Sequence, residues 1–259
     1  MKVKDIVEIL NQIAPPELAL SFDHVGLMTG SMENDVNKIM VCLDLDGRVI
    51  DEVISNGCDM VITHHPLIFH PAVDLTEDNV RGRLLCKIVR AGLTVFSAHT
   101  NLDFTQGGVN DALAEKLGLV NITATPDGFH RYGELPESVS FKAFAALADE
   151  KLSAEGVKCV VPETFDIEKS ICKVGVSCGS YDGEVEWIYE NGIEVLVTGE
   201  VKHSAAIDLS MERFATISAG HYPTEIWGAE ALYRTLFEKL GDKVEILMSR
   251  QGKNPLQSL

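Results

Sequence analysis

The stretch KIMVCLDLDGRVIDEVISNGCDMVITHHP, residues 38–66, contains a strand, a helix and a second strand in close succession. Residues 38–44 form an apolar run that is typical of a buried strand. Residues 48–55 predict a short helix, because the Asn56-Gly57 pair that follows is a common helix end. Residues 59–63 are apolar again and predict the next strand. Strands that follow each other through a helix are usually parallel, so this stretch indicates an α/β fold.

The same alternation continues on both sides of this stretch. An amphipathic pattern predicts a helix over residues 3–13, which Pro15-Pro16 would end. We also expect helices over residues 81–91, 110–117, 183–190, 205–211 and 224–240. Further strands are expected over residues 94–98, 173–177, 194–198 and 215–219. Residues 119–170 are less regular and suggest two strands, over 141–145 and 159–161. Short links between the regular elements imply mainly parallel sheets covered on both faces.

Two parts of the chain resemble each other. Four residues of the first part recur 135 positions later: Lys38, Asn56, Gly57 and Thr63 correspond to Lys173, Asn191, Gly192 and Thr198. Residues 99–103 and 221–225 also correspond, since each has a histidine followed four positions later by a carboxylate. Chance remains an alternative, because strand-helix-strand units resemble one another by default. We favour two related, interlocked α/β lobes, the first at 1–125 and completed by 222–259, the second at 126–221.

The composition narrows the classes of partner. The chain has 259 residues, of which 46% are hydrophobic, so a sizeable core is expected. Its 39 acidic and 22 basic residues give a formal net charge of −17, which disfavours binding to nucleic acid or to an anionic membrane. No apolar run reaches the roughly 20 residues that span a bilayer, and the N-terminus lacks an apolar signal core, so the cytoplasm is the expected location. The six cysteines include no CxxC pair, and we expect buried, reduced thiols at Cys42, Cys58 and Cys86.

Three of the expected strands are followed directly by residue types that bind metals. His64-His65-Pro66 follows the strand at 59–63, and ligand sites in open α/β sheets lie at the carboxyl ends of strands. Adjacent residues on extended backbone point in opposite directions, so the two histidines suit two neighbouring ions. Pro66 restricts His65 to extended conformations. The alternative is a polar surface turn, which a bare His-His pair favours.

The other two strand ends carry His99 to Asp103 and His221 to Glu225. Asp103 is either a ligand or a cap of the following turn. His221 and Glu225 are four positions apart, so a helix that begins near Pro223 would direct both toward one point. Alternatively, Thr224 is an N-cap and Glu225 a favourable acid of the first turn, which leaves His221 without a role.

The combination is more specific than any single motif. Three imidazoles and two carboxylates suit two borderline divalent ions, for which we consider Zn, Fe, Mn, Co or Ni. Two ions roughly 3.5–4 Å apart are the usual arrangement for metal-assisted hydrolysis. We therefore expect two ions per subunit in the cleft between the lobes, bound by His64, His65, Asp103, His221 and Glu225.

These motifs also resemble the NIF-three-like family, whose members are often called GTP cyclohydrolase I type 2 homologues. The resemblance covers nearly the whole chain and rests on Asp23-His-Val-Gly-Leu27, Thr63-His-His-Pro66, His99-Thr-Asn-Leu-Asp103, Thr198-Gly-Glu200 and Gly220-His-Tyr-Pro-Thr-Glu225. In that family the positions that match the five residues above bind a dinuclear metal centre. The family usually has Trp-Asp-Asn where this chain has Phe22-Asp23-His24, so the additional histidine alters substrate contacts, adds a metal contact or replaces a hydrogen-bonding residue neutrally.

The resemblance implies several further properties. This chain is a short form without the middle domain that longer members insert, and a homo-oligomer built as a hexameric ring is expected. The cyclohydrolase label implies hydrolytic opening of the guanine imidazole ring of GTP. His99 and Glu200 are then candidates for proton transfer, or else hydrogen-bond partners of the metal ligands. Asp23 and His24 are candidates for substrate binding. The sequence contains no glycine-rich phosphate loop.

Three functions remain open on this basis. The first is a dinuclear metal-dependent hydrolase that acts on a small molecule, either a nucleotide or another phosphorylated or cyclic amide substrate. The second is a non-catalytic protein that binds or delivers metal. The third is a regulatory adaptor whose acidic surface binds other proteins.

Overall fold

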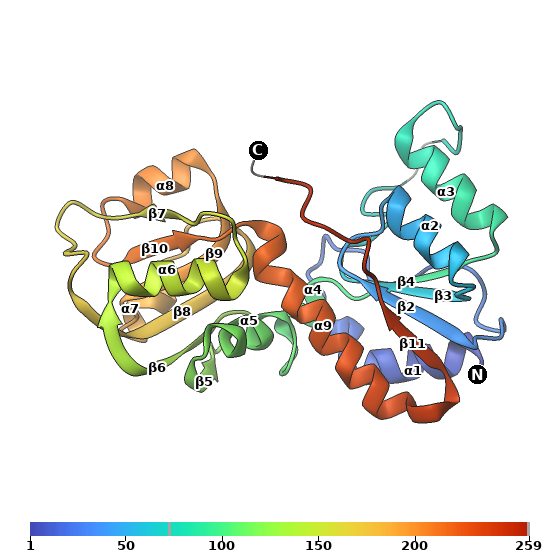
Figure 1. The fold of residues 1–259 in the computed structure, drawn as a ribbon, viewed down its shortest axis with the longest axis horizontal. Helices are drawn as coiled ribbons and strands as arrows, with labels where there is room; N and C mark the ends of the chain where they lie inside the picture. Colours follow the sequence, from blue (N-terminus) through green and yellow to red (C-terminus); the bar gives the residue numbers. More distant parts are fainter. Residues whose placement is uncertain (72–73, 258–259) are drawn as a thin grey trace. The chain divides into compact units, whose positions relative to one another are not determined.

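The computed structural model describes residues 1–71 and 74–257, which form two compact units (Figure 1). The first unit contains the described residues of 1–105 and 229–253, and the second contains residues 106–228 and 254–257. Helix α5 (Val109–Leu117) belongs to the second unit, because it packs on the strands of that unit. The long helix α9 (His221–Leu240) supplies residues to both units.

The first unit has a sheet that is parallel except at one edge. Its strand order is β1 (Gly26–Thr29), β4 (Thr94–Ser97), β3 (Met60–Thr63), β2 (Lys38–Cys42) and β11 (Glu245–Met248). Only the pairing of β1 with β4 is antiparallel. Strands β2, β3 and β4 are buried along nearly their whole length, which explains why their sequences are continuous apolar runs.

Helices cover both faces of this sheet. Helices α2 (Gly47–Ser55) and α3 (Val80–Arg90) pack on one face, where Ile50, Ile88 and Val95 belong to one hydrophobic cluster. Helix α1 (Val3–Ile13) and the second part of α9 lie on the other face (Figure 1). A short 3-10 turn, η1 (Pro16–Leu18), follows α1, and α4 (Thr100–Phe104) follows β4. A second turn, η2 (Gly241–Lys243), leads into β11.

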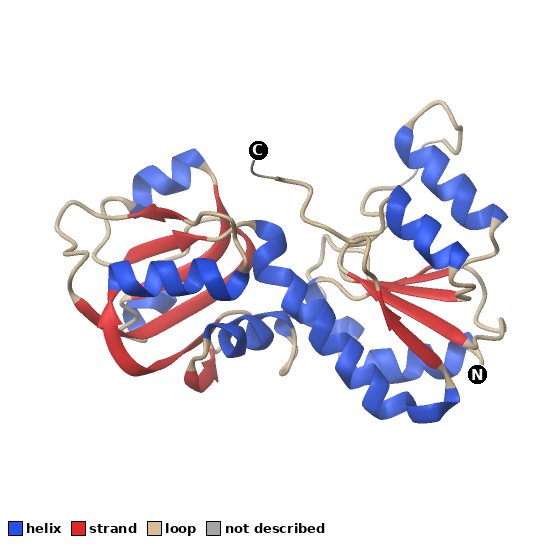
Figure 2. Ribbon diagram, in the orientation of Figure 1, coloured by secondary structure: helices blue, strands red, loops and turns tan. Residues whose placement is uncertain are grey.

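The second unit has a mixed sheet with a parallel centre. The order is β5 (Val120–Ala124), β6 (Arg131–Ser140), β8 (Ser170–Tyr181), β9 (Val195–Val201), β10 (Ala215–Ser218) and β7 (Lys158–Val160). Strands β8, β9 and β10 are parallel, whereas β5, β6 and β7 pair antiparallel. Helices α7 (Glu186–Glu190) and α8 (His203–Leu209) contribute Trp187 and Leu209 to one hydrophobic cluster, and α5 and α6 (Phe141–Leu152) pack elsewhere on the sheet (Figure 2).

The two units repeat one strand-helix-strand motif, as the sequence suggests. In the first unit Cys42 pairs with Thr63 across β2 and β3, and 135 positions later Ser177 pairs with Thr198 across β8 and β9. The two Asn-Gly helix ends are equivalent as well, since Gly57 and Gly192 have φ of 66° and 61°.

Hydrogen bonds at the start of the motif repeat too. The Asp59 carboxylate accepts the backbone N–H groups of residues 37 and 38, and the Glu194 carboxylate accepts those of residues 172 and 173. Asp59 lies just before β3 and holds the start of the neighbouring strand β2. Glu194 lies just before β9 and holds the equivalent residues of the neighbouring strand β8, so the register of the two strands is the same in both units. The prediction of two related α/β lobes is confirmed.

Some local predictions are wrong. Residues 141–145 form the start of α6 and not a strand, because the Ser140 side chain accepts a hydrogen bond from the Ala143 N–H and caps the helix. Helix α7 begins at Glu186 and not at residue 183. Of the three cysteines expected to be buried, Cys42 and Cys58 are buried, but Cys86 is only partly buried. Among the described residues no helix combines the length and apolar character that a bilayer span requires.

Candidate metal centre

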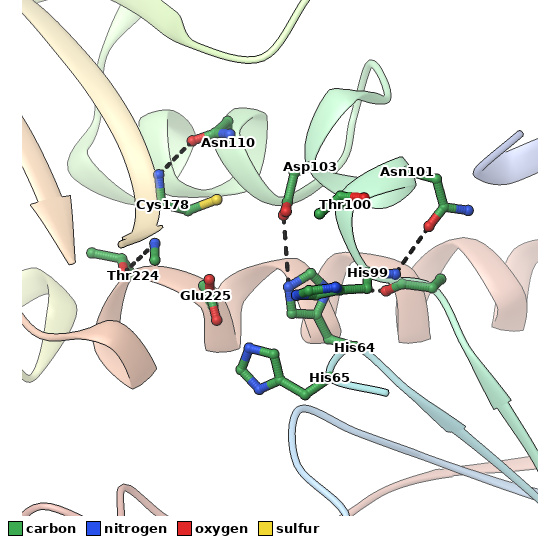
Figure 3. Close-up of polar contacts among 12 residues, drawn as sticks. His64, His65, His99, Thr100, Asn101, Asp103, Asn110, Cys178, Thr224 and Glu225 are labelled. Carbon is green, nitrogen blue, oxygen red and sulfur yellow. Dashed lines mark hydrogen bonds and ion pairs between the residues drawn. The ribbon is translucent and has the colours of Figure 1, made fainter. Parts of the chain in front are cut away.

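Three histidines of the first unit lie together at the carboxyl ends of its parallel strands. His64 and His65 follow β3, and His99 follows β4 by one residue and forms the N-cap of α4. The potential ligand atoms of the three rings lie within 4.8 Å of one another. The ring centroids of His64 and His65 are 4.9 Å apart, and those of His64 and His99 are 5.1 Å apart. This spacing suits imidazoles that share a small polar site (Figure 3).

Each of these rings is held through its Nδ1 atom. The Nδ1 of His64 lies 2.9 Å from the carbonyl oxygen of Ala98, and the Nδ1 of His65 lies 2.7 Å from Asp44 Oδ1. The Nδ1 of His99 lies 2.9 Å from Asp23 Oδ1. A carbonyl oxygen can only accept, so His64 carries its proton on Nδ1. A neutral ring in that tautomer has its lone pair on Nε2, which is the form that a metal ion requires.

Asp103 adds a carboxylate to the three histidines, and we call these four residues the half-site of the first unit. It lies in α4, it is only 5% exposed, and its Oδ1 is 3.6 Å from His64 Nε2. Asn101 stabilises the turn into α4, because its side-chain oxygen accepts the His99 backbone N–H (Figure 3). The sequence alternative, in which Asp103 merely caps a turn, does not describe its position, since the residue lies one turn inside the helix.

The carboxylate of Asp23 is hydrogen-bonded to residues of the first unit. Besides His99, its carboxylate accepts hydrogen bonds from the Thr100 N–H at 3.0 Å and the Thr100 hydroxyl at 2.6 Å. Burial by itself raises the pKa of the Asp23 carboxyl, but the hydrogen bonds from His99 and Thr100 outweigh it and hold that pKa well below its ordinary value. The Asp23 side chain has no exposed surface, so its contacts are those of a residue that orients His99. The ring of His24 contacts the carbonyl oxygen of Ile68 at 3.1 Å.

The second unit has a half-site of similar construction. His221 and Glu225 lie on the first turns of α9, and His221 Nε2 is 3.0 Å from Glu225 Oε2. The other ring nitrogen, Nδ1, is 2.9 Å from Glu200 Oε1. The Ser180 hydroxyl donates to the same Glu200 oxygen at 2.8 Å. These hydrogen bonds from His221 and Ser180 lower the pKa of the Glu200 carboxyl, which is therefore an anion that orients the His221 ring.

Two glycines make room for this half-site, and the sequence analysis assigned neither of them a role. Gly179 has φ of 63°, and a Cβ atom there would lie 2.4 Å from Glu225 Oε1. A Cβ at Gly199 would lie 2.3 Å from the carbonyl oxygen of Gly179 and 2.7 Å from the Thr224 hydroxyl. That hydroxyl also accepts the Gly179 N–H at 3.3 Å (Figure 3). The only sequence signal was the presence of glycines just beyond or near the ends of apolar strands.

A cavity of about 370 Å³ adjoins the second half-site. Glu200 and His221 lie in its wall, together with Lys158 and residues 254, 256 and 257 of the C-terminal segment. Its volume falls within the range of small-molecule sites. The second unit therefore offers space for a small ligand beside its histidine and carboxylates.

The residues present fit divalent metal ions of the borderline class. Imidazole nitrogens oriented by carboxylates or carbonyl oxygens, with further carboxylates beside them, are the typical environment of Zn and its neighbours. In the first unit His64, His65, His99 and Asp103 offer such donors, and in the second unit His221 and Glu225 do. The cysteines do not contribute to these groups.

The fold and these donors define a class: α/β proteins with two related sheet units and histidine-carboxylate sites at the ends of parallel strands. The family model described as Duf34/NIF3 (NGG1p interacting factor 3) matches residues 1–255, and the chain belongs to this family. The recognition based on sequence motifs is thus confirmed.

Named relatives and solved structures agree with this assignment. A protein of Clostridium acetobutylicum named GTP cyclohydrolase 1 type 2 homolog is 32% identical over 267 residues, which cover 98% of each chain. A Staphylococcus aureus hypothetical protein has a TM-score of 0.93 at 25% identity and covers 100% of this chain and 99% of its own. Reduced HcgD from Methanocaldococcus jannaschii has a TM-score of 0.80 at 28% identity, over 96% and 97% of the two chains.

Proposed function

We propose that this protein binds two divalent metal ions per subunit and acts as a metal-dependent hydrolase on a small molecule. The proposed ligands are His64, His65, Asp103, His221 and Glu225. One observation carries the proposal: the Nδ1 atoms of four imidazoles each contact an oxygen, namely Ala98 O, Asp44, Asp23 and Glu200. This pattern orients the Nε2 atoms for coordination, and histidines that bind metal ions almost always donate their other ring N–H to a carboxylate, a carbonyl oxygen or water.

The ions belong to the group of Zn, Fe, Mn, Co and Ni, because the proposed donors are nitrogens and carboxylate oxygens without thiolates. When bound, a pair of such ions supplies Lewis-acid chemistry, which polarises a substrate and lowers the pKa of water. The residues of the chain bind the ions, hold them in position, and donate or accept protons. His99 lies among the proposed ligands and is a candidate for proton transfer. Glu200 is a second candidate, and its contacts with His221 and Ser180 also support a role in orienting the ring.

The name carried by the relatives suggests a substrate. Curated relatives are called GTP cyclohydrolase 1 type 2 homolog, which points to hydrolysis of a cyclic amidine C–N bond such as that of the guanine imidazole ring. The cavity beside His221 and Glu200 gives a small molecule access to the second half-site. Within the same proposal, His24 is a candidate for substrate contact, and Asp23 contributes by holding His99. We further propose assembly as a homohexameric ring, from family likeness, and a cytoplasmic location.

A second function uses the same ligands without catalysis. The protein would then bind metal and deliver it. The strongly acidic composition, with a net charge of −17, favours a protein that attracts cations.

Elemental analysis of the purified protein tests the proposal. Metal per subunit is measured on the wild type, on His65→Ala and on His203→Ala, and GTP hydrolysis is assayed on the same samples. His203 is an exposed histidine of α8 and is the control for loss of a surface imidazole. Near two ions in the wild type and in His203→Ala, fewer in His65→Ala, and metal-dependent turnover are expected. Two ions without turnover would favour metal binding or delivery, and no metal after reconstitution would refute both functions.

A further inference from the structure

An exposed aromatic side chain lies on a firmly held turn next to the histidines of the first unit. Phe22 is 64% exposed, although exposing a phenyl ring to water is unfavourable. Its turn is closed by a hydrogen bond from the Asp23 N–H to the Leu20 carbonyl oxygen at 2.9 Å. The Leu20 N–H donates to the Thr100 hydroxyl at 3.0 Å, and Asp23 accepts from Thr100 and His99. The Phe22 backbone is therefore fixed while its ring remains in solvent.

A second ring connects Phe22 with the histidine cluster. The ring centroids of Phe22 and Phe69 are 6.3 Å apart, and those of Phe69 and His99 are 6.0 Å apart. The ring of His24 contacts the carbonyl oxygen of Ile68, which ties the loop of Phe69 to the turn of Phe22. Phe22 and Phe69, which we call the aromatic ledge, thus form a continuous apolar surface that leads to His99.

Resting on the proposed function, we propose that the aromatic ledge binds the planar ring of the substrate while the histidines hold its reacting or anionic group. The substrate class is a small anionic molecule with an aromatic or heteroaromatic ring. Phe22 and Phe69 present ring faces and edges without hydrogen-bond groups, so they recognise a ring by stacking and dispersion. The ledge therefore selects for a planar ring and tolerates different ring types.

Paired probes separate the ring from the anionic group. Phenyl phosphate is compared with methyl phosphate, and GTP with inorganic triphosphate, by calorimetric titration of the metal-loaded full chain. The ring-bearing member of each pair is expected to bind more tightly, and Phe22→Ala should reduce its affinity by roughly 5- to 150-fold, the range for loss of one base–aromatic stack. The affinity for the ring-free member should stay the same. Phe22→Trp should retain the preference for the ring.

Phe237 provides a matched control, since it is 56% exposed on α9, and Phe237→Ala should retain the ring preference. The inference is overturned if ring-bearing probes bind no more tightly than ring-free ones, at any metal content, or if Phe22→Ala keeps the preference. It is equally overturned if Phe22→Ala changes only the molecular mass in solution, which would make the ledge a contact between copies. Metal content is measured on the same samples, because a wild type without metal refutes the proposed function whereas normal metal without ring preference refutes only the ledge.

Discussion

The Nδ1 atom of His65 lies 2.7 Å from the Oδ1 atom of Asp44, just beyond the end of β2. This contact directs the Nε2 atom of the ring away from the carboxylate, and it couples two strand ends that are neighbours in the sheet. We predict that Asp44→Ala weakens metal binding by roughly 10- to 100-fold, because the ring loses the partner that orients it and raises its basicity. A competition titration with a chromophoric chelator measures the effect.

Asp78→Asn is the control for removal of a negative charge, since Asp78 is an exposed residue outside the half-site. It should bind metal like the wild type. Equal weakening in both variants would mean that general electrostatic attraction, and not orientation of His65, accounts for the loss.

The contact between Gly179 and Glu225 gives a second prediction. A methyl group at position 179 would lie 2.4 Å from Glu225 Oε1 and must displace that carboxylate. Gly179→Ala should therefore lower the metal content of the protein, in addition to a strain of about 1–2 kcal/mol at a left-handed backbone position. Metal content by elemental analysis and the free energy of unfolding in urea separate the two effects.

Gly192→Ala is closely matched to this variant. Gly192 has φ of 61°, against 63° for Gly179, and a Cβ atom there has no neighbour within 4 Å. The two variants should share the loss of stability that comes from backbone strain, but Gly192→Ala should keep its metal. If Gly192→Ala also loses metal, backbone strain alone explains the effect and the Glu225 contact does not.

The elements of the parallel sheets were predictable because burial on both faces leaves a local mark. Strand β2 and the first three residues of β9, 195–197, are apolar runs, and Gly57 and Gly192 end the helices that follow β2 and precede β9. The antiparallel strands were harder, because β5 is exposed or half-buried and β6 alternates irregularly. Residues 141–145 were misread as a strand, since so short an apolar segment does not separate the strand period from the helix period, and the cap at Ser140 decided for a helix.

The candidate site divides in the same way. His64 and His221 could be found from sequence because they follow strands, which fixes them near a carboxyl edge. Asp44 and Gly179 could not, because their roles depend on contacts with residues 21 and 46 positions away in the chain. Such contacts follow from the packing of strands and helices, which no local pattern encodes.

Metal removal should lower the stability of the protein. Ligands that bind only the folded state add free energy of unfolding by mass action, about 2.7 kcal/mol when the free ion is at a hundred times its Kd. We expect the melting temperature to fall on addition of a chelator and to recover with metal. In His65→Ala the melting temperature should respond much less, and a full response there would exclude His65 as a ligand.

His130 gives a prediction that is independent of metal. The ring is 4% exposed and stacks on Trp187, with centroids 4.2 Å apart and planes inclined by 5°. Burial is the main cause that lowers the pKa of His130 to about 4, while the Asp127 carboxylate raises this pKa and the Arg131 guanidinium lowers it further. Its Nε2 atom lies 3.9 Å from Glu184, whose side chain is largely exposed.

The sign of the effect follows from proton binding. Between pH 6.5 and about 4 the unfolded chain protonates this histidine while the folded protein does not, so stability is complete above pH 6.5 and falls as the pH drops toward 4. The loss is of the order of 3 kcal/mol at the acid end. In His130→Phe, which keeps an aromatic ring against Trp187, the free energy of unfolding should fall less between pH 7 and pH 4 than in the wild type. Urea unfolding at both pH values measures the difference, and equal losses in the two proteins would show that His130 is already protonated in the folded state.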